Sequence, residues 1–139
     1  TKSGISGISL EGGSTESSKN RIVAAGGISY SVATNTNSFT GDEITRGSQD
    51  GWHLFSSGNT FSKCRVTKPG DDGFELEAGS NTFSKCKVRK AADAGVVLAT
   101  GGNAFTECSA KKSGGFDLDD NCVPGTNAYV NCTFPNAAP

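Results

Sequence analysis

Hydrophobic and polar residues alternate along this chain in short segments that return at a fixed spacing. Between residues 50 and 134, each copy contains a Gly-apolar-x-Leu segment, then Asn-x-aromatic, then Cys-x-apolar. Two-residue alternation over so few positions predicts β-strands, because successive side chains of a strand point to opposite faces. Each segment is too short for a helix, so we expect three short strands in every copy.

The copies repeat every 22 to 24 residues. Phenylalanines and cysteines form the clearest columns, at Phe39, Phe61, Phe83 and Phe105, and at Cys64, Cys86, Cys108 and Cys132. A repeat of this length, rich in Gly, Asn, Ser and Thr, predicts a solenoid with one supersecondary unit per coil. The dense leucines of a leucine-rich repeat and the helical spacing of ankyrin repeats are both absent from the sequence. We therefore predict an all-β fold, a right-handed parallel β-helix of about six coils with 20–24 residues each.

We expect a single domain over residues 1–139, with regular coils at 48–134 and less regular coils at 1–47. Parity divides each first strand into two faces. The inward positions are predicted to be Trp52 and Leu54, Phe74 and Leu76, Val96 and Leu98, and Phe116 and Leu118. The outward positions between them are His53, Glu75, Val97 and Asp117. A column of asparagines (Asn59, Asn81, Asn103, Asn127) is predicted to occupy a turn, where each amide bonds to the next copy.

The aligned cysteines are expected to form a ladder of buried, reduced thiols that pack as small hydrophobic groups. Cys122 lies outside this column, and a disulfide from it to Cys132 or Cys108 is left open. The last residues, 135–139, are too few to form a cap. Solenoid ends need covering, so we expect that an end loop covers them, that the chain pairs with a partner, with self-association through the ends as one possibility, or that the sequence is a piece of a longer protein.

Composition narrows the functional classes. The chain is 34% hydrophobic and 19% charged with a net charge of −1, which suits a structure with mostly solvated turns and outer faces. Without a run of about 18 apolar residues we expect no membrane span, and we expect no nucleic-acid partner. The sequence starts with neither a methionine nor a secretory signal, so we interpret it as a mature or trimmed form.

Charged residues collect around the turn that follows each third strand. The outward positions before this turn are basic and comprise Arg65, Lys68, Lys87, Arg89, Lys90, Lys111 and Lys112. Asp71 and Asp72 lie in the turn, Asp50 precedes Asp72 by one period, and Glu75 follows three residues later. Convergent carboxylates suit calcium, which takes six to eight oxygen ligands. The alternative is a set of weak surface ion pairs with the lysines.

The run Asp-Gly-Trp-x-Leu-Phe at 50–55 is followed one coil later by Asp-Asp-Gly-Phe-Glu-Leu at 71–76. This pair of motifs, within residues 48–120, resembles the right-handed β-helix pectate lyases of the polysaccharide lyase family 9 type. The resemblance implies calcium bound by Asp50, Asp71, Asp72 and Glu75, with Glu75 standing where the family has Asp. It also implies a lysine base, for which Lys111 is the best match and Lys112 the second choice.

By this resemblance the protein is expected to be a secreted, calcium-dependent lyase that cleaves a uronate polymer such as pectate by β-elimination. Calcium would stabilise the negative charge that develops at the uronate. The acidic polysaccharide would contact Lys87, Arg89, Lys90 and His53, although a lone surface histidine is more often incidental. Two alternatives stay open: a non-catalytic carbohydrate-binding β-helix, and a structural module whose ends stack on neighbours.

Overall fold

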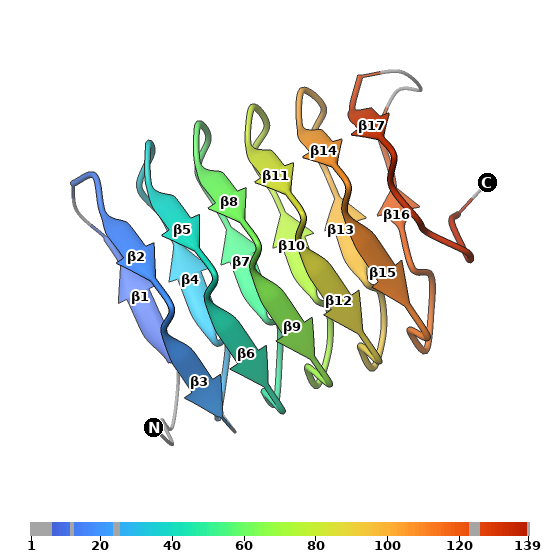
Figure 1. The fold of residues 1–139 in the computed structure, drawn as a ribbon, viewed down its shortest axis with the longest axis horizontal. Helices are drawn as coiled ribbons and strands as arrows, with labels where there is room; N and C mark the ends of the chain where they lie inside the picture. The colour runs from blue at the N-terminus through green and yellow to red at the C-terminus, as the bar shows by residue number, and fades with distance from the viewer. Residues whose placement is uncertain (1–6, 12, 24–25, 123–125, 139) are drawn as a thin grey trace.

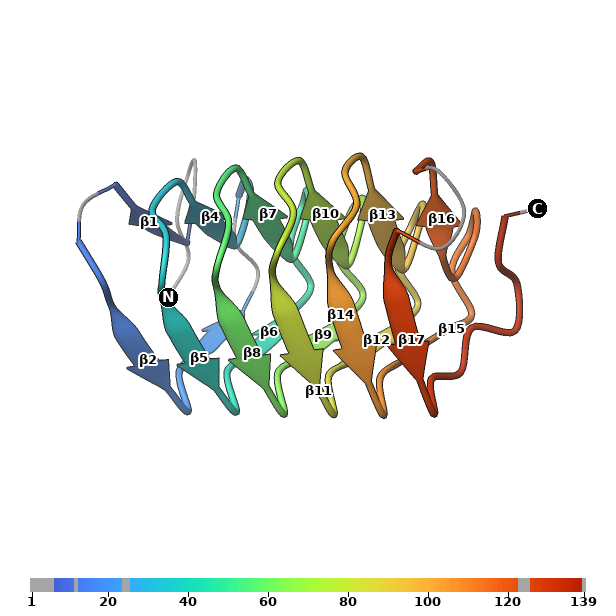
Figure 2. The same cartoon turned by 90° about the horizontal axis from the view of Figure 1, so that it is seen from above.

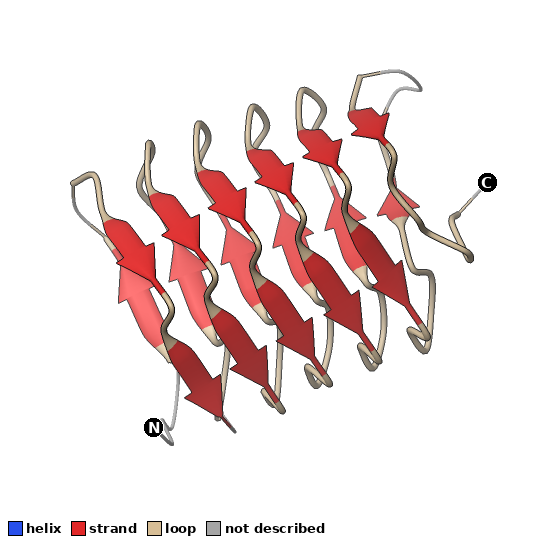
Figure 3. Cartoon of the chain, viewed as in Figure 1, coloured by secondary structure: helices blue, strands red, loops and turns tan. Residues whose placement is uncertain are grey.

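The computed structural model describes residues 7–11, 13–23, 26–122 and 126–138, and all regular structure in these ranges is β-strand (Figure 3). The strands form three parallel sheets, here called A, B and C. Sheet A contains β1 (Ile8–Leu10), β4 (Tyr30–Val32), β7 (Trp52–Leu54), β10 (Phe74–Leu76), β13 (Val96–Leu98) and β16 (Asp119–Asp120). Sheet B contains β2 (Glu16–Ser18), β5 (Ser38–Thr40), β8 (Thr60–Ser62), β11 (Thr82–Ser84), β14 (Ala104–Thr106) and β17 (Ala128–Val130). Sheet C contains β3 (Arg21–Val23), β6 (Glu43–Thr45), β9 (Arg65–Thr67), β12 (Lys87–Arg89) and β15 (Ser109–Lys111).

Each strand pairs with the strands one coil before and one coil after it, so the three sheets run along the whole stack (Figures 1 and 2). In Figure 1, sheet A lies behind sheets B and C. The register follows the 22-residue period, with Phe74 opposite Trp52 and Val96 opposite Phe74. Five coils carry a strand in all three sheets, and part of a sixth follows, which confirms the predicted solenoid of about six coils.

The core is a column of side chains that point inward from the three sheets. The aromatic rings of sheet B stack one above another, with centroids 4.7 Å apart for Phe39 and Phe61 and 4.6 Å apart for Phe61 and Phe83. The predicted column continues through Phe105 to Tyr129. Burial of such rings supplies most of the favourable free energy of folding, and their stacking adds to it.

The predicted asparagine ladder is confirmed at the turn between sheets A and B. The backbone N–H of Asn59 donates to Oδ1 of Asn81 at 2.9 Å, and that of Asn81 donates to Oδ1 of Asn103 at 3.1 Å. The ladder reaches Asn37 at one end and Asn127 at the other. Because these residues are buried, the amides satisfy backbone groups that water cannot reach.

All five cysteines are free thiols, which confirms the expected reduced ladder and excludes both open pairings of Cys122 in this structure. Cys64, Cys86 and Cys108 are buried, whereas Cys132 at the end of the column is partly exposed. Asp42 takes the place of a cysteine one coil earlier, and its buried carboxylate accepts hydrogen bonds from Ser17 Oγ and Asn20 N.

The register predicted for the last coil is wrong by two residues. Strand pairing places Asp119 beside Val97 and Asp120 beside Leu98, so Leu118, not Phe116, occupies the level of Val96. Phe116 is 39% exposed and Asp117 is buried, the reverse of the prediction. The Gly-aromatic-x-Leu motif misled the alignment because the backbone keeps its 22-residue spacing through β16. The two extra residues of this coil fall later, between Asn103 and Asn127.

The C-terminal tail also differs from the prediction, because it folds back onto the last coil of sheet A. The N–H of Asp117 donates to the carbonyl of Asn136, and the N–H of Ala138 donates to the carbonyl of Leu118. Leu118 and Ala137 form an isolated parallel bridge. The tail therefore covers part of the strand edge at this end of the stack.

Candidate functional site

Stacked carboxylates occupy the turn that leads from sheet C into sheet A. Oδ1 of Asp50 accepts the N–H of Asp72 at 3.2 Å, and Oδ1 of Asp72 accepts the N–H of Ala94 at 2.7 Å. Glycine follows each aspartate, because a Cβ at Gly51 would lie 2.6 Å from the carbonyl oxygen of Gly73. The close approach of successive coils thus explains the repeated Asp-Gly pair and places Asp50 directly beside Asp72.

Asp50, Asp71 and Asp72 form a group that we call the acidic turn cluster, with one oxygen of each within 4.8 Å of the others. Asp50 and Asp72 are buried, whereas Asp71 is exposed. Burial, followed by the charges of Asp50, Asp71 and Asp93, raises the pKa of Asp72 to about 6. Burial and the charges of Asp50 and Asp93 also raise the pKa of Asp71. Repulsion among these carboxylates is the electrostatic condition that a bound cation would relieve.

The fourth predicted calcium ligand, Glu75, belongs to a neighbouring group on the outer face of sheet A. Nδ1 of His53 lies 3.4 Å from Oδ2 of Asp50 and 3.2 Å from Oε2 of Glu75, while Nε2 lies 3.0 Å from Oε1 of Glu77. We call these four residues the histidine cluster. Asp50 is common to both clusters, so Glu75 is joined to the acidic turn cluster only through Asp50.

Charge and burial act in opposite directions in the histidine cluster. Burial raises the pKa of Glu75 to about 7, in spite of the opposing charge of His53. Burial alone would lower the pKa of His53, but the nearby carboxylates of Asp50, Glu77 and Glu75 outweigh it, so that this pKa is raised. For Asp50, burial is outweighed by His53 and by the N–H of Asp72, and its pKa is lowered.

The predicted basic residues line the outer face of sheet C, and we call them the basic strip: Arg65, Lys68, Lys87, Arg89, Lys90, Lys111 and Lys112. Pairing places Arg89 beside Lys111 and Arg65 beside Lys87. A hollow of about 420 Å³ lies over this face, lined by five of these cations together with Thr67 and a single carboxylate, that of Glu43. Lys90 and Lys112 occupy turn positions with positive φ, at 56° and 63°.

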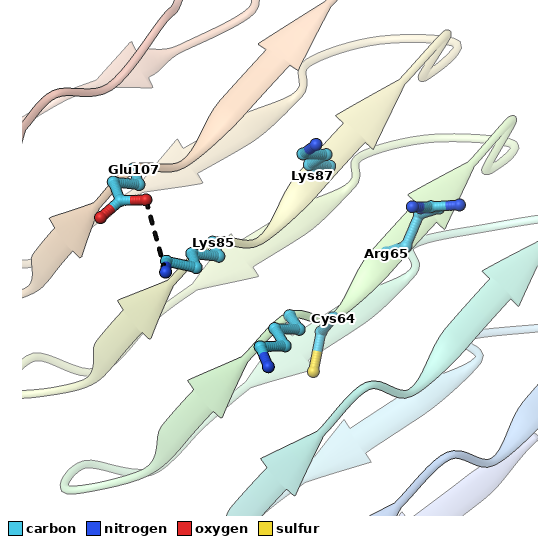
Figure 4. Close-up of a pocket in the computed structure, with 6 residues that line it drawn as sticks. Cys64, Arg65, Lys85, Lys87 and Glu107 are labelled. Atoms are coloured by element: carbon cyan, nitrogen blue, oxygen red, sulfur yellow. Dashed lines mark ion pairs between the residues drawn. The ribbon is translucent and has the colours of Figure 1, made fainter.

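A second hollow, of about 440 Å³, adjoins the first near the bend between sheets B and C (Figure 4). Lys63, Lys85 and Lys87 line it, and Lys85 pairs with Glu107 at 3.6 Å. Together the two hollows give this side of the solenoid a surface whose charged groups are mostly cations. Such a surface attracts polyanions.

The structure brings the predicted acidic residues together but keeps the predicted lysines apart from them. Lys87, Arg89, Lys90, Lys111 and Lys112 are all exposed, and within the described ranges no ion pair joins any of them to the acidic turn cluster. The turn itself separates the outer face of sheet C from that of sheet A (Figure 1). Lys111 is level with Arg89 in sheet C.

Glu77 was not predicted from the sequence, although it contacts Nε2 of His53, the second ring nitrogen. A signal for it was present, because Glu77 follows Glu75 with the same parity and lies one coil beyond Phe55. His53 was predicted to contact substrate. In the structure its ring lies among the carboxylates of Asp50, Glu75 and Glu77 and stacks on Phe55, with centroids 4.0 Å apart, and its contact with substrate stays a prediction.

Comparison with known proteins identifies the family of the fold. A family model described as a right handed beta helix region matches residues 1–138. Neither the curated proteins nor the solved structures contain a significant match to the chain. No helix among the described residues is long and apolar enough to cross a membrane. The family match covers almost the whole sequence and agrees with the observed parallel coils, so the chain belongs to the right-handed β-helix family.

Proposed function

We propose that this protein is a secreted, calcium-dependent lyase that cleaves an acidic polysaccharide of the pectate class by β-elimination. The observation that carries the proposal is the acidic turn cluster, in which Asp50, Asp71 and Asp72 offer carboxylate oxygens within 4.8 Å of one another. It lies at the end of sheet C, whose outer face presents the basic strip. A cation site beside a cationic surface suits a polymer that carries a carboxylate on every sugar.

The donor set fits calcium. All three residues supply hard oxygen ligands, and three carboxylates leave room in a shell of six to eight for water and substrate oxygens. Asp71 is exposed, so this side of the cluster is open to solvent. Burial, followed by the charges of Asp50, Asp71 and Asp93, raises the pKa of Asp72 to about 6, and a bound cation would offset the part that comes from these charges. When bound, calcium would supply electrostatic stabilisation of the charge that develops on the uronate carboxylate.

The remaining roles fall to the basic strip. Arg89 and Lys87 would hold neighbouring uronates through charge-assisted hydrogen bonds. Nζ of Lys111 would accept the proton that leaves the carbon next to the uronate carboxylate, with Lys112 as the second choice. As this C–H bond breaks, a carbon–carbon double bond forms, the bond from the β-carbon to the glycosidic oxygen breaks, and this oxygen takes a proton from water to become a hydroxyl of the released fragment.

The activity test measures the absorbance of the unsaturated product on pectate, alginate and glucuronan. We expect product to form with calcium and to stop after addition of a chelator. Lys111→Ala should lower the rate by 10²-fold or more, the usual size of a general-base contribution. Lys19→Ala, an exposed lysine on the first coil, is the matched control and should keep full activity. Unchanged activity in Lys111→Ala would show that Lys111 is not the base and would leave Lys112 as the candidate.

Calcium binding is tested separately by calorimetry. Asp71→Asn should weaken it, because the variant removes one charged ligand at an exposed position where the fold is not at risk. The neighbouring substitution Lys68→Ala leaves the carboxylates intact and should retain calcium binding. Equal affinity in wild type and Asp71→Asn would count against the acidic turn cluster as the calcium site.

A second candidate function is non-catalytic binding of acidic polysaccharide. It is favoured by the 420 Å³ hollow, in which five cations face a single carboxylate. Under this proposal pectate binds but no product forms, and the affinity falls with added salt because exposed charges are screened. Arg89→Ala should weaken co-sedimentation with pectate, whereas Lys19→Ala should not.

A further inference from the structure

The histidine cluster contains an unpartnered ring nitrogen at its centre. Nδ1 of His53 is buried and has no hydrogen-bond partner, although two carboxylate oxygens lie 3.4 and 3.2 Å away. The side chain of His53 is 12% exposed and that of Asp50 is 8% exposed. A buried ring nitrogen without a hydrogen bond is costly unless something else occupies its lone pair.

The separations around this nitrogen match those of metal ligands. Zinc binds imidazole nitrogen and carboxylate oxygen at about 2.0–2.2 Å in tetrahedral geometry, which places two ligand atoms about 3.3–3.5 Å apart. The nitrogen–oxygen separations of 3.4 Å to Asp50 and 3.2 Å to Glu75 are close to that edge length. One metal ion could therefore contact Nδ1 and both carboxylate oxygens, a role that is consistent with the absence of a hydrogen bond at this nitrogen.

The opposite side of the imidazole has the partner that metal-bound histidines have. Nε2 lies 3.0 Å from Oε1 of Glu77. In metal sites a second carboxylate accepts the free N–H of the ring, which fixes the tautomer and leaves the other nitrogen available to the metal. The stacked ring of Phe55 covers one face of the imidazole and restricts its rotation.

We propose that Asp50, His53 and Glu75 form a binding site for a divalent transition metal, with zinc as the best match, and that Glu77 orients the histidine. The site is distinct from the calcium site and does not depend on the lyase proposal. Imidazole favours zinc and its neighbours in the first row, whereas calcium prefers oxygen alone. The two sites share only Asp50, of which Oδ2 faces His53 while Oδ1 accepts the N–H of Asp72.

Three protein ligands leave one tetrahedral position open. Glu75 is 31% exposed, so this position is accessible from the outer face of sheet A. The ligand that fits it is water or an anionic oxygen, such as the carboxylate of an acidic sugar. The same coil therefore would carry one hard-cation site at the turn and one softer-cation site on the sheet.

The experiment titrates the chelator-treated full chain with Zn²⁺ by calorimetry and with Co²⁺ by visible absorption. We expect one Zn²⁺ per chain and a tetrahedral Co²⁺ spectrum. His53→Ala should abolish both, and Glu77→Gln should weaken Zn²⁺ binding 10–100-fold, as loss of an orienting partner does. Because His53→Ala removes a ring that Phe55 packs against, the partly exposed Glu75→Gln, which keeps the side-chain volume, serves as the second variant and should also weaken binding.

Two controls separate this proposal from its neighbours. Asp71→Asn should lose calcium affinity yet keep Zn²⁺ binding. Glu75→Gln should keep calcium affinity and lose Zn²⁺ affinity. Cys122 and Cys132 are partly exposed thiols, so the double variant Cys122→Ser, Cys132→Ser should leave the titration unchanged, and the Co²⁺ spectrum should lack thiolate charge-transfer absorption. Absence of Zn²⁺ binding, or equal binding by wild type, His53→Ala and Glu75→Gln, would overturn the proposal and leave the calcium site untouched.

Discussion

Aspartate and asparagine perform the same structural task at two different turns of this solenoid. Asn81 accepts the backbone N–H of Asn59, and Asp72 accepts that of Ala94. Each Oδ1 therefore satisfies a buried donor of an adjacent coil. The amide does so at no electrostatic cost, whereas stacked carboxylates repel one another. At the turn from sheet C into sheet A, two such aspartates, Asp50 and Asp72, lie on successive coils, and this stacking of carboxylates is the residue-scale observation that favours a cation there.

The carboxylates of both clusters should make stability depend on pH. The pKa of Asp72 rises from 3.8 to about 6 and that of Glu75 from 4.5 to about 7 on folding. Between about pH 4 and pH 7 the folded state therefore binds more protons than the unfolded state. The free energy of unfolding must fall as the pH rises through this window. The raised pKa of His53 acts in the same direction above pH 6.5.

Urea unfolding in the presence of a chelator should accordingly show lower stability at pH 8 than at pH 5. Asp72→Asn keeps the Oδ1 acceptor for Ala94 but removes the charge, so its pH dependence should be flatter than that of wild type. Calcium should restore stability more at pH 8 than at pH 5, because it binds the ionised carboxylates. Stability that increases from pH 5 to pH 8 in chelator would contradict this account.

At the scale of single strands, the last coil shows which interaction sets the register. Sequence similarity favours Phe116 as the inward residue, whereas backbone pairing places Leu118 there. Leu118 is 7% exposed and Phe116 is 39% exposed. Pairing prevails because a two-residue slip would remove the hydrogen bonds that Gly115 and Asp117 make to Asp93 and Asn136.

This register predicts an order of stabilities. Leu118→Ala should cost roughly 2–5 kcal/mol, the range for a buried leucine, while Phe116→Ala should cost no more than about 0.5–1 kcal/mol, as for an exposed site. Denaturant unfolding of the two variants measures the difference. The opposite order, with the phenylalanine variant the less stable, would favour the register of the motif.

For the whole molecule, the described strands leave β1, β2 and β3 at one end of their sheets, with each paired on one side only. The other end is partly covered by the folded-back tail. Unpaired strand edges present backbone donors and acceptors to other chains. We propose that copies of this chain associate through the β1–β3 end.

Sedimentation velocity over a hundredfold range of protein concentration tests this association. We expect a dimer to accumulate at high concentration, because the outer edges of β1, β2 and β3 in two copies can pair with each other. Addition of 1 M salt should not dissociate the dimer, since backbone hydrogen bonds rather than surface charges hold the two copies together. A monomer at every concentration would show that this end is protected.

Much of the fold followed from the sequence because a solenoid turns a period in sequence into contact in space. Residues 22 apart, such as Phe61 and Phe83, are neighbours in sheet B, so a column in the alignment becomes a column in the core. The asparagine ladder and the stacking of Asp50 beside Asp72 followed from the same rule. The sequence alone therefore determined the fold class, the coil length, the core columns and the acidic turn.

The tertiary structure decided everything that does not repeat. The contacts of the tail with Asp117 and Leu118 have no counterpart in the other coils, so the repeat could not predict them. The two extra residues of the last coil lie after β16 and not before it, and the repeat could not predict this either. The histidine cluster depends on which way three neighbouring side chains turn outside sheet A, and a period fixes their level but not their torsion angles. Only the tertiary structure brings Glu77 to Nε2 of His53 and places Nδ1 near two carboxylates, because side-chain torsion angles depend on local contacts such as that of His53 with Phe55.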